Sequence, residues 1–118
     1  MPRLRALVVD DVLDMAQTIA NDLGSAGFET EVAGDGASAL RQFVKEPTDV
    51  VVTDLRMKGG DGLDLLAGLR EADPNVPVII MTAFGAVESA VEAMRRGAYH
   101  YVTKPFALET LRTLVERA

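Results

Sequence analysis

A few polar side chains recur at equivalent points of the sequence, each just after a short and mostly apolar segment. They are a pair of aspartates, a single aspartate, a threonine and a lysine, namely Asp10-Asp11, Asp54, Thr82 (followed by Ala83) and Lys104 (followed by Pro105-Phe106). Any one aspartate is explained equally well as the N-cap of a helix. Independent caps, however, give no reason for a lone Lys and a Thr to join three carboxylates, so the set indicates one site.

The chemistry of this set is that of a hard cation and a phosphoryl group. Three clustered carboxylates repel one another, which raises their pKa values unless a cation lies between them. Oxygen ligands without Cys or a His pair favour Mg²⁺ with several waters retained. Mg²⁺ beside a carboxylate, a Lys and a Thr suggests phosphoryl transfer, with a carboxylate oxygen attacking in line. Asp54 is the best nucleophile because it follows the central apolar run and the other groups flank it.

Five segments are predicted to be strands that position these groups. Leu7–Val9, Val50–Val52 and Val78–Ile80 are apolar at every position, which is typical of strands covered on both faces of a parallel sheet. Residues 28–32 and 99–103 alternate in polarity instead, which predicts half-covered strands at the edges.

Helical spacing of apolar residues lies between these strands. We assign all five apolar stripes to the core rather than to a cofactor site. The stripes are Ala16, Ile19, Ala20, Leu23 and Ala26; Ala37, Leu40 and Val44; Leu63, Leu66 and Leu69; Val87, Ala90, Val91 and Met94; and Leu108, Leu111 and Val115. The predicted stops are Gly27, Pro47, Pro74 and Gly97.

Alternation of strands and helices predicts an α/β fold. With right-handed crossovers and the second and fifth strands at the edges, it is a flavodoxin-like (βα)5 domain. The parallel sheet then has the order 2-1-3-4-5 with helices on both faces. In such sheets the site lies beyond the carboxyl ends of the strands, between the first and third.

Composition restricts the function classes. A chain of 118 residues predicts one domain, covering residues 1–118. It has no Cys, which excludes disulfides, thiolate metal sites and thiol catalysis. It also lacks a long apolar run or signal peptide, which leads us to expect no membrane association and a cytoplasmic location. The net charge of −6 argues against direct nucleic acid binding.

The combination Asp10-Asp11, Asp54, Thr82-Ala83 and Lys104-Pro105-Phe106 resembles the receiver domain of bacterial two-component response regulators. The likeness runs from about Leu4 to about Val115. The stretches 81–85, 87–91 and 97–99 look most like the receivers of nitrogen-regulation-type (sigma-54-dependent) transcriptional activators.

The resemblance implies a role for each residue. Asp54 would accept a phosphoryl group from a sensor histidine kinase. Asp11, Asp54 and the backbone carbonyl of Arg56 would ligate Mg²⁺, with Asp10 acting largely through water. Lys104, Thr82 and the backbone of Ala83 would contact the phosphoryl group, Thr82 and Tyr101 would form the switch, and Arg56 and Phe84 would modulate the lifetime of the adduct. In this family the Lys104–Pro105 bond is usually cis.

Two positions depart from the family pattern, Lys58 replacing the commoner Pro and Gly60 the commoner Met, and both should loosen the loop after Asp54. His100 stands where Asp is commoner, and a surface or packed role is favoured for it.

The leading hypothesis is a phosphorylation-dependent switch and not a turnover enzyme. Phosphorylation of Asp54 would alter the surface of the fourth helix, fifth strand and fifth helix. That surface would control an output, through a phosphorylation-dependent homodimer or through docking to a partner. We expect an N-terminal domain whose output part regulates transcription.

Four alternatives remain open. The first is a stand-alone receiver that docks to a partner protein. The second is an Mg²⁺-dependent aspartyl-phosphate phosphatase, although Arg56 stands where dehalogenase-type enzymes have their general acid. The third is a flavodoxin-like cofactor binder, disfavoured because Asp10-Asp11 would repel a phosphate. The last is a pseudo-receiver, which would have no use for a complete acid triad.

Overall fold

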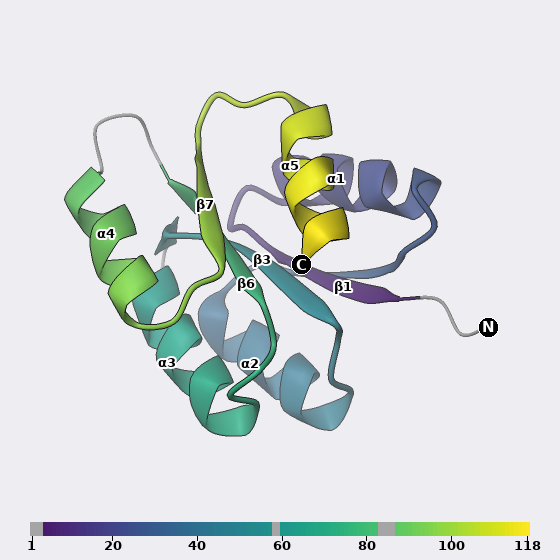
Figure 1. The fold of residues 1–118 in the computed structure, drawn as a ribbon. Helices are drawn as coiled ribbons and strands as arrows, with labels where there is room; N and C mark the ends of the chain where they lie inside the picture. The colour runs from purple at the N-terminus through teal and green to yellow at the C-terminus, as the bar shows by residue number, and fades with distance from the viewer. Residues whose placement is uncertain (1–3, 58–59, 83–86) are drawn as a thin grey trace.

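The computed structural model describes residues 4–57, 60–82 and 87–118 as a three-layered α/β structure (Figure 1). Five parallel strands form the central sheet in the order β2-β1-β3-β6-β7. These are β1 (Arg5–Val9), β2 (Glu29–Ala33), β3 (Val50–Asp54), β6 (Val78–Thr82) and β7 (His100–Thr103). Counted along the sheet this is the order 2-1-3-4-5, so the flavodoxin-like topology and both edge strands are confirmed.

Helices cover both faces of the sheet. The helices α1 (Leu13–Ser25) and α5 (Leu108–Arg117) lie on one face, and α2 (Gly36–Lys45), α3 (Gly62–Ala72) and α4 (Val87–Arg95) on the other (Figure 1). The core is accordingly split into two apolar clusters, one under each layer of helices. No helix in the described ranges is both long and apolar enough to cross a bilayer.

The helix ends follow the predicted stop signals. Gly27 and Gly97 adopt φ of 103° and 102° after α1 and α4, a conformation that suits glycine because it has no Cβ. The helices α2 and α3 end before Pro47 and Pro74, and the side chain of Asp35 caps α2 by accepting a hydrogen bond from the Ser38 amide.

Three predicted stripes are only partly correct. In α2 the buried residues are Ala39 and Phe43, whereas Val44 is 63% exposed. In α4 Ala90 and Ala93 are buried, whereas Val91 and Met94 lie largely at the surface. Ala26, assigned to the first stripe, is the exposed C-cap residue of α1.

The segment after β3 contains an additional element. The strands β4 (Arg56–Met57) and β5 (Gly60–Asp61) pair antiparallel before α3 begins at Gly62. Gly60 thus lies in β5, and Lys58 lies outside the described residues.

Candidate functional site

Three aspartates meet at the carboxyl edge of the sheet, as predicted. Asp10 and Asp11 follow β1, and Asp54 is the last residue of the neighbouring β3. One carboxylate oxygen from each lies within 4.8 Å of the others. The parallel pairing of β1 with β3 brings them together, although Asp11 and Asp54 are 43 positions apart along the chain.

Asp10 is completely buried, and hydrogen bonds hold its carboxylate. One oxygen accepts from the Val12 amide at 2.9 Å, and the other lies 3.3 Å from Nζ of Lys104. A buried carboxylate is stable only when it is paired and hydrogen-bonded in this way. Its position is therefore fixed by the start of α1 on one side and by Lys104 on the other.

Lys104 connects the two strands that carry the carboxylates. It follows the edge strand β7, and its Nζ lies 3.3 Å from Oδ2 of both Asp10 and Asp54. Burial alone would lower the pKa of Lys104, but the charges of Asp54 and Asp10 outweigh burial and raise it. The side chain is consequently an ammonium ion at neutral pH. The Lys104–Pro105 peptide bond is cis, as the resemblance implied.

Asp54 lies deeper than a surface carboxylate, with its side chain 13% exposed. Burial raises the pKa of Asp54, the charge of Lys104 opposes that rise, and the charge of Asp10 adds to it. The net result is a pKa above the usual range for aspartate. Asp54 therefore carries a charge that its surroundings only partly stabilise, which leaves room for a further cation.

The third strand end adds a hydroxyl group. Thr82 ends β6 and is 2% exposed, and its Oγ1 has no hydrogen-bond partner among the described residues. Its carbonyl accepts a hydrogen bond of 2.7 Å from the Lys104 amide, which joins the ends of β6 and β7. A buried hydroxyl without a partner is uncommon, because leaving it unsatisfied costs about 1–3 kcal/mol. It is thus available to a ligand at this edge.

The other predicted residues differ in how much the structure says of them. Tyr101 lies in β7 and packs partly buried against the cluster formed with α2, α3 and α4. Arg56 lies in β4 with an exposed side chain. Ala83 and Phe84 lie outside the described residues. His100 is exposed, and its Nδ1 lies 2.8 Å from the Tyr101 amide.

The donor set suits a hard divalent cation. It offers only oxygen atoms, from three carboxylates within 4.8 Å of one another, and such ligands favour Mg²⁺ over thiophilic or imidazole-binding metals. The raised pKa of Asp54 agrees with a group that is better stabilised once such an ion is bound. The residues present therefore fit the metal that the sequence implied.

Two residues beside the site were missed by the sequence analysis. Thr53 is completely buried, and its Oγ1 donates to the backbone carbonyl of Asp54 at 3.0 Å. Gly62 approaches the same carbonyl so closely that a Cβ there would lie 2.6 Å from it. The strand prediction rests on Val50–Val52 and treats the segment after Asp54 as a loop, so it singles out neither residue. A hydroxyl inside an otherwise apolar run was the one available signal.

Comparison with known proteins decides the family. The family model described as "Response regulator receiver domain" matches residues 6–116, nearly the whole chain. The chain belongs to this family. The receiver fold is also found in the crystal structure of the receiver domain of NtrX from Brucella abortus, which is 38% identical with a TM-score of 0.91 over 95% of each chain.

Receivers of transcriptional regulators are among the similar curated proteins. The regulatory protein AtoC of Escherichia coli is 43% identical over 97% of this chain, and the DNA-binding transcriptional regulator NtrC of the same species is 39% identical over 94%. The response regulator PilR of Pseudomonas aeruginosa is 36% identical over the full chain. The expected likeness to nitrogen-regulation-type activators is thereby confirmed. This chain spans about a quarter of the length of these relatives, 25%, 24% and 26% respectively.

Proposed function

We propose that Asp54 accepts a phosphoryl group from the phosphohistidine of a sensor kinase in an Mg²⁺-dependent reaction, and that the chain acts as a phosphorylation switch. One observation carries the proposal. Three carboxylates share a pocket with an ammonium group 3.3 Å from two of them, and the buried hydroxyl of Thr82, without a partner, lies on the adjacent strand.

The attacking group in this reaction is a carboxylate oxygen of Asp54. The oxygen forms a bond to phosphorus as the bond from phosphorus to the histidine nitrogen breaks. The nitrogen keeps the electron pair of that bond and takes a proton from solvent. Asp11, Asp54 and the Arg56 carbonyl would hold Mg²⁺, with Asp10 acting through water, and the bound ion would balance charge on the phosphoryl oxygens.

Lys104 and Thr82 stabilise the product in this proposal. Lys104 is already charged and aimed at Asp54, so it can pair with a phosphoryl oxygen without a large rearrangement. Thr82 has an unused hydroxyl donor. Ala83 would contribute its backbone, and Arg56 and Phe84 would regulate the access of water to the adduct.

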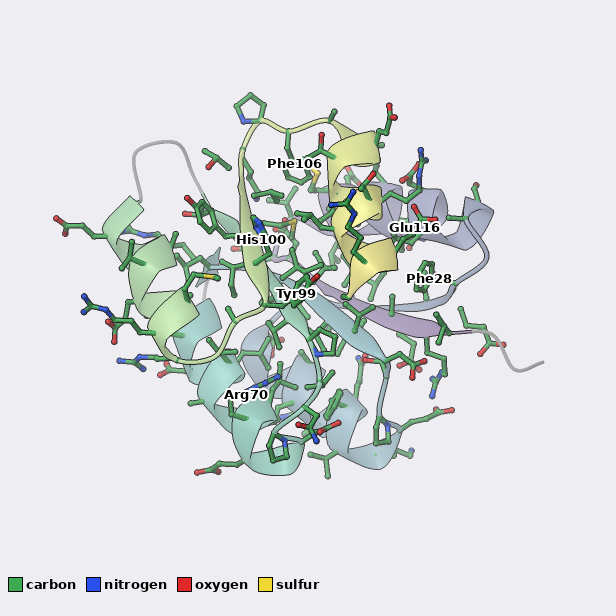
Figure 2. All side chains as sticks on the ribbon, viewed as in Figure 1. Phe28, Arg70, Tyr99, His100, Phe106 and Glu116 are labelled. Carbon is green, nitrogen blue, oxygen red and sulfur yellow. The ribbon has the colours of Figure 1, made fainter. Side chains whose placement is uncertain are left out.

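The switch extends from the pocket to the face formed by α4, β7 and α5. Phosphorylation adds about −1.5 to −2 charge at Asp54, and movement of Thr82 toward it would let Tyr101 move inward behind it. His100 is the first residue of β7 and Tyr99 directly precedes it, and both lie between α4 and α5 (Figure 2). A groove of about 520 Å³, lined by residues that include Tyr101, Phe106 and Leu114, lies along β7 and α5. This face would control dimerisation or docking to an output domain.

The output we propose is transcription, through further domains of a longer protein. The support is that this chain spans only about a quarter of relatives that include a DNA-binding transcriptional regulator. The receiver itself would not bind DNA, and it would not turn over a substrate.

The test is incubation with Mg²⁺ and acetyl phosphate, followed by measurement of the intact mass. We expect one alkali-labile phosphoryl adduct, which is absent with a chelator and absent in Asp54→Asn. Continuous release of phosphate from a phosphomonoester would instead identify a phosphatase. An unmodified wild-type chain would contradict the proposal.

A further inference from the structure

The peptide bond that follows the phosphoacceptor is held at both of its polar atoms. The carbonyl of Asp54 accepts a hydrogen bond from Oγ1 of Thr53 at 3.0 Å. The amide at the other end of the same bond, that of Leu55, donates to the carbonyl of Met81 at 2.9 Å. With both groups bonded, this peptide plane cannot rotate without breaking one of two partly buried hydrogen bonds.

The corner that follows is closed equally tightly. The Gly62 amide donates to the Leu55 carbonyl at 2.6 Å, and this hydrogen bond joins the two ends of the segment that contains the β4–β5 pair. A Cβ at position 62 would lie 2.6 Å from the Asp54 carbonyl oxygen and 2.9 Å from Cα of Leu55. Only glycine therefore lets α3 begin so close to the acceptor.

Among the hydrogen bonds described here, the one from Thr53 is made by a side chain, whereas those from the Leu55 and Gly62 amides are made by the backbone. Thr53 is 0% exposed, so its Oγ1 has no role in solvent contact, and valine would fill the same space. The ladder between β1 and β3 ends at the pair Val9–Thr53, one residue before Asp54. Asp54 thus lies where pairing with β1 has stopped, and a side chain supplies a donor there.

We infer that Thr53 is a positioning residue for phosphoryl transfer. Its hydroxyl holds the Asp54–Leu55 peptide, and through it the direction of the Asp54 carboxylate and the start of the segment that carries the Arg56 carbonyl. The inference rests on the proposed function of Asp54 and adds a group that touches neither the metal nor the phosphoryl group.

The test compares two substitutions at position 53 with a matched control. Thr53→Val removes the hydroxyl and keeps the shape, whereas Thr53→Ser keeps the hydroxyl. The control is Thr48→Val. Thr48 is also buried, and its hydroxyl donates to the Val50 carbonyl at 3.0 Å, at the opposite end of the same strand. The measurements are the phosphorylation rate with acetyl phosphate at saturating Mg²⁺, the Mg²⁺ affinity from amide chemical shifts, and hydrogen exchange at the Leu55 amide.

We expect Thr53→Val to be phosphorylated roughly threefold to tenfold more slowly, as loss of one hydrogen bond predicts, with weaker Mg²⁺ binding and faster exchange at Leu55. Thr53→Ser should stay within about twofold of wild type, because it retains the donor. Thr48→Val should lose stability but keep the wild-type rate and Mg²⁺ affinity. If Thr53→Val does not fold, Thr53→Ala replaces it in the comparison with Thr53→Ser.

Three results would overturn the inference. Thr53→Val could react at the wild-type rate, Thr53→Ser could be as slow as Thr53→Val, or Thr48→Val could be equally slow. The second would assign the effect to methyl packing and the third to general stability. A wild-type chain that takes up no phosphoryl group would overturn the proposed function instead. Mg²⁺ affinity and Leu55 exchange would then still decide whether Thr53 holds the acceptor peptide.

Discussion

Asp54 lies in surroundings that disfavour its charged form. Burial and the neighbouring Asp10 raise its pKa, and Lys104 offsets only part of that effect. Shifted pKa values are common among the carboxylates of functional sites, and a bound cation would stabilise the charge of Asp54. The pKa shift therefore has consequences for stability as well as for chemistry.

The substitution Asp54→Asn should stabilise the metal-free protein near neutral pH. The folded-state pKa is raised above the ordinary value of 3.8, so the folded form binds this proton more tightly than the unfolded chain does. That contribution to stability is complete below pH 3.8 and is lost as the pH rises through the folded-state pKa. The gain in Tm from Asp54→Asn should accordingly be present near neutral pH and should shrink below pH 3.8.

The measurement is thermal unfolding in the presence of a chelator, once near neutral pH and once below pH 3.8. Asp22→Asn is a suitable control of opposite sign, since it removes the ion pair at 3.1 Å between Asp22 and Arg112. A lower Tm for Asp54→Asn near neutral pH would show that Lys104 outweighs burial, contrary to the direction stated here.

Lys104 should contribute to stability mainly when metal is absent. In Lys104→Met two neighbouring carboxylates lose the ammonium that lies 3.3 Å from each. We expect the free energy of unfolding to fall by about 1–3 kcal/mol without metal. Saturating Mg²⁺ should narrow this deficit, because the ion replaces the missing positive charge and binds the folded state. Urea unfolding with and without Mg²⁺ measures both values, and an unchanged deficit would contradict this account.

At the scale of elements, the start of α3 depends on one residue without a side chain. Gly62→Ala should lower the free energy of unfolding by about 1–3 kcal/mol, since the added Cβ meets backbone atoms at 2.6 and 2.9 Å. Gly24→Ala is the matched control, because it lies in α1 with nothing within 4 Å of the added Cβ. That variant should be stabilised by up to about 1 kcal/mol, as a helical Gly→Ala change predicts. Chemical denaturation of both variants gives the comparison, and equal effects would be incompatible with the close approach at Gly62.

The strands were predictable from the sequence, whereas the rotation of two helices was not. Runs such as Val50–Val52 are apolar at every position and can only be covered on both faces. In α2, by contrast, the predicted stripe is rotated by about one residue from the observed one, because packing against the sheet and α3 buries Phe43 rather than Val44. In α4 the small residues Ala90 and Ala93 face the sheet. Hydropathy favours burial of the larger Val91 and Met94, and it cannot show how closely a helix approaches the sheet.

The candidate site was predictable to the extent that it depends on strand ends. Asp10 and Lys104 directly follow their strands, and Asp54 and Thr82 are the last residues of theirs. Parallel pairing was therefore enough to bring all four together. Thr53 could not be recognised in this way. A threonine inside a strand is explained by β-propensity alone, and its bond to the Asp54 carbonyl depends on coordinates.

At the scale of the whole molecule, the sheet connects the pocket to one particular face. The ends of β6 and β7 are joined by the hydrogen bond from Lys104 to Thr82, and β7 is an edge strand that lies between α4 and α5 (Figure 1). The strand β2 is joined to the pocket through the buried Asp10, whose amide donates to the Ala33 carbonyl at 3.1 Å, whereas β7 is joined to it through Lys104 and Thr82, the groups proposed to close on the phosphoryl group. A change at Asp54 should therefore alter β7 and α5 more strongly than α2 and β2.

Amide chemical shifts provide the test of this asymmetry. On phosphorylation we expect changes in the pocket to extend over β7 and α5 and to be several-fold smaller over α2 and β2. Asp54→Asn treated with acetyl phosphate is the control and should show none of them. Changes confined to the pocket, or spread equally over α2, would refute the proposed route to the output face.

The most direct measurement for the central claim is chemical identification of the acceptor. Borohydride reduces an aspartyl phosphate to homoserine, which peptide mapping by mass spectrometry can locate. After treatment with acetyl phosphate and Mg²⁺, we predict homoserine at position 54 and at no other aspartate. Homoserine at position 10 or 11, or none in a chain that has taken up a phosphoryl group, would contradict the assignment of Asp54.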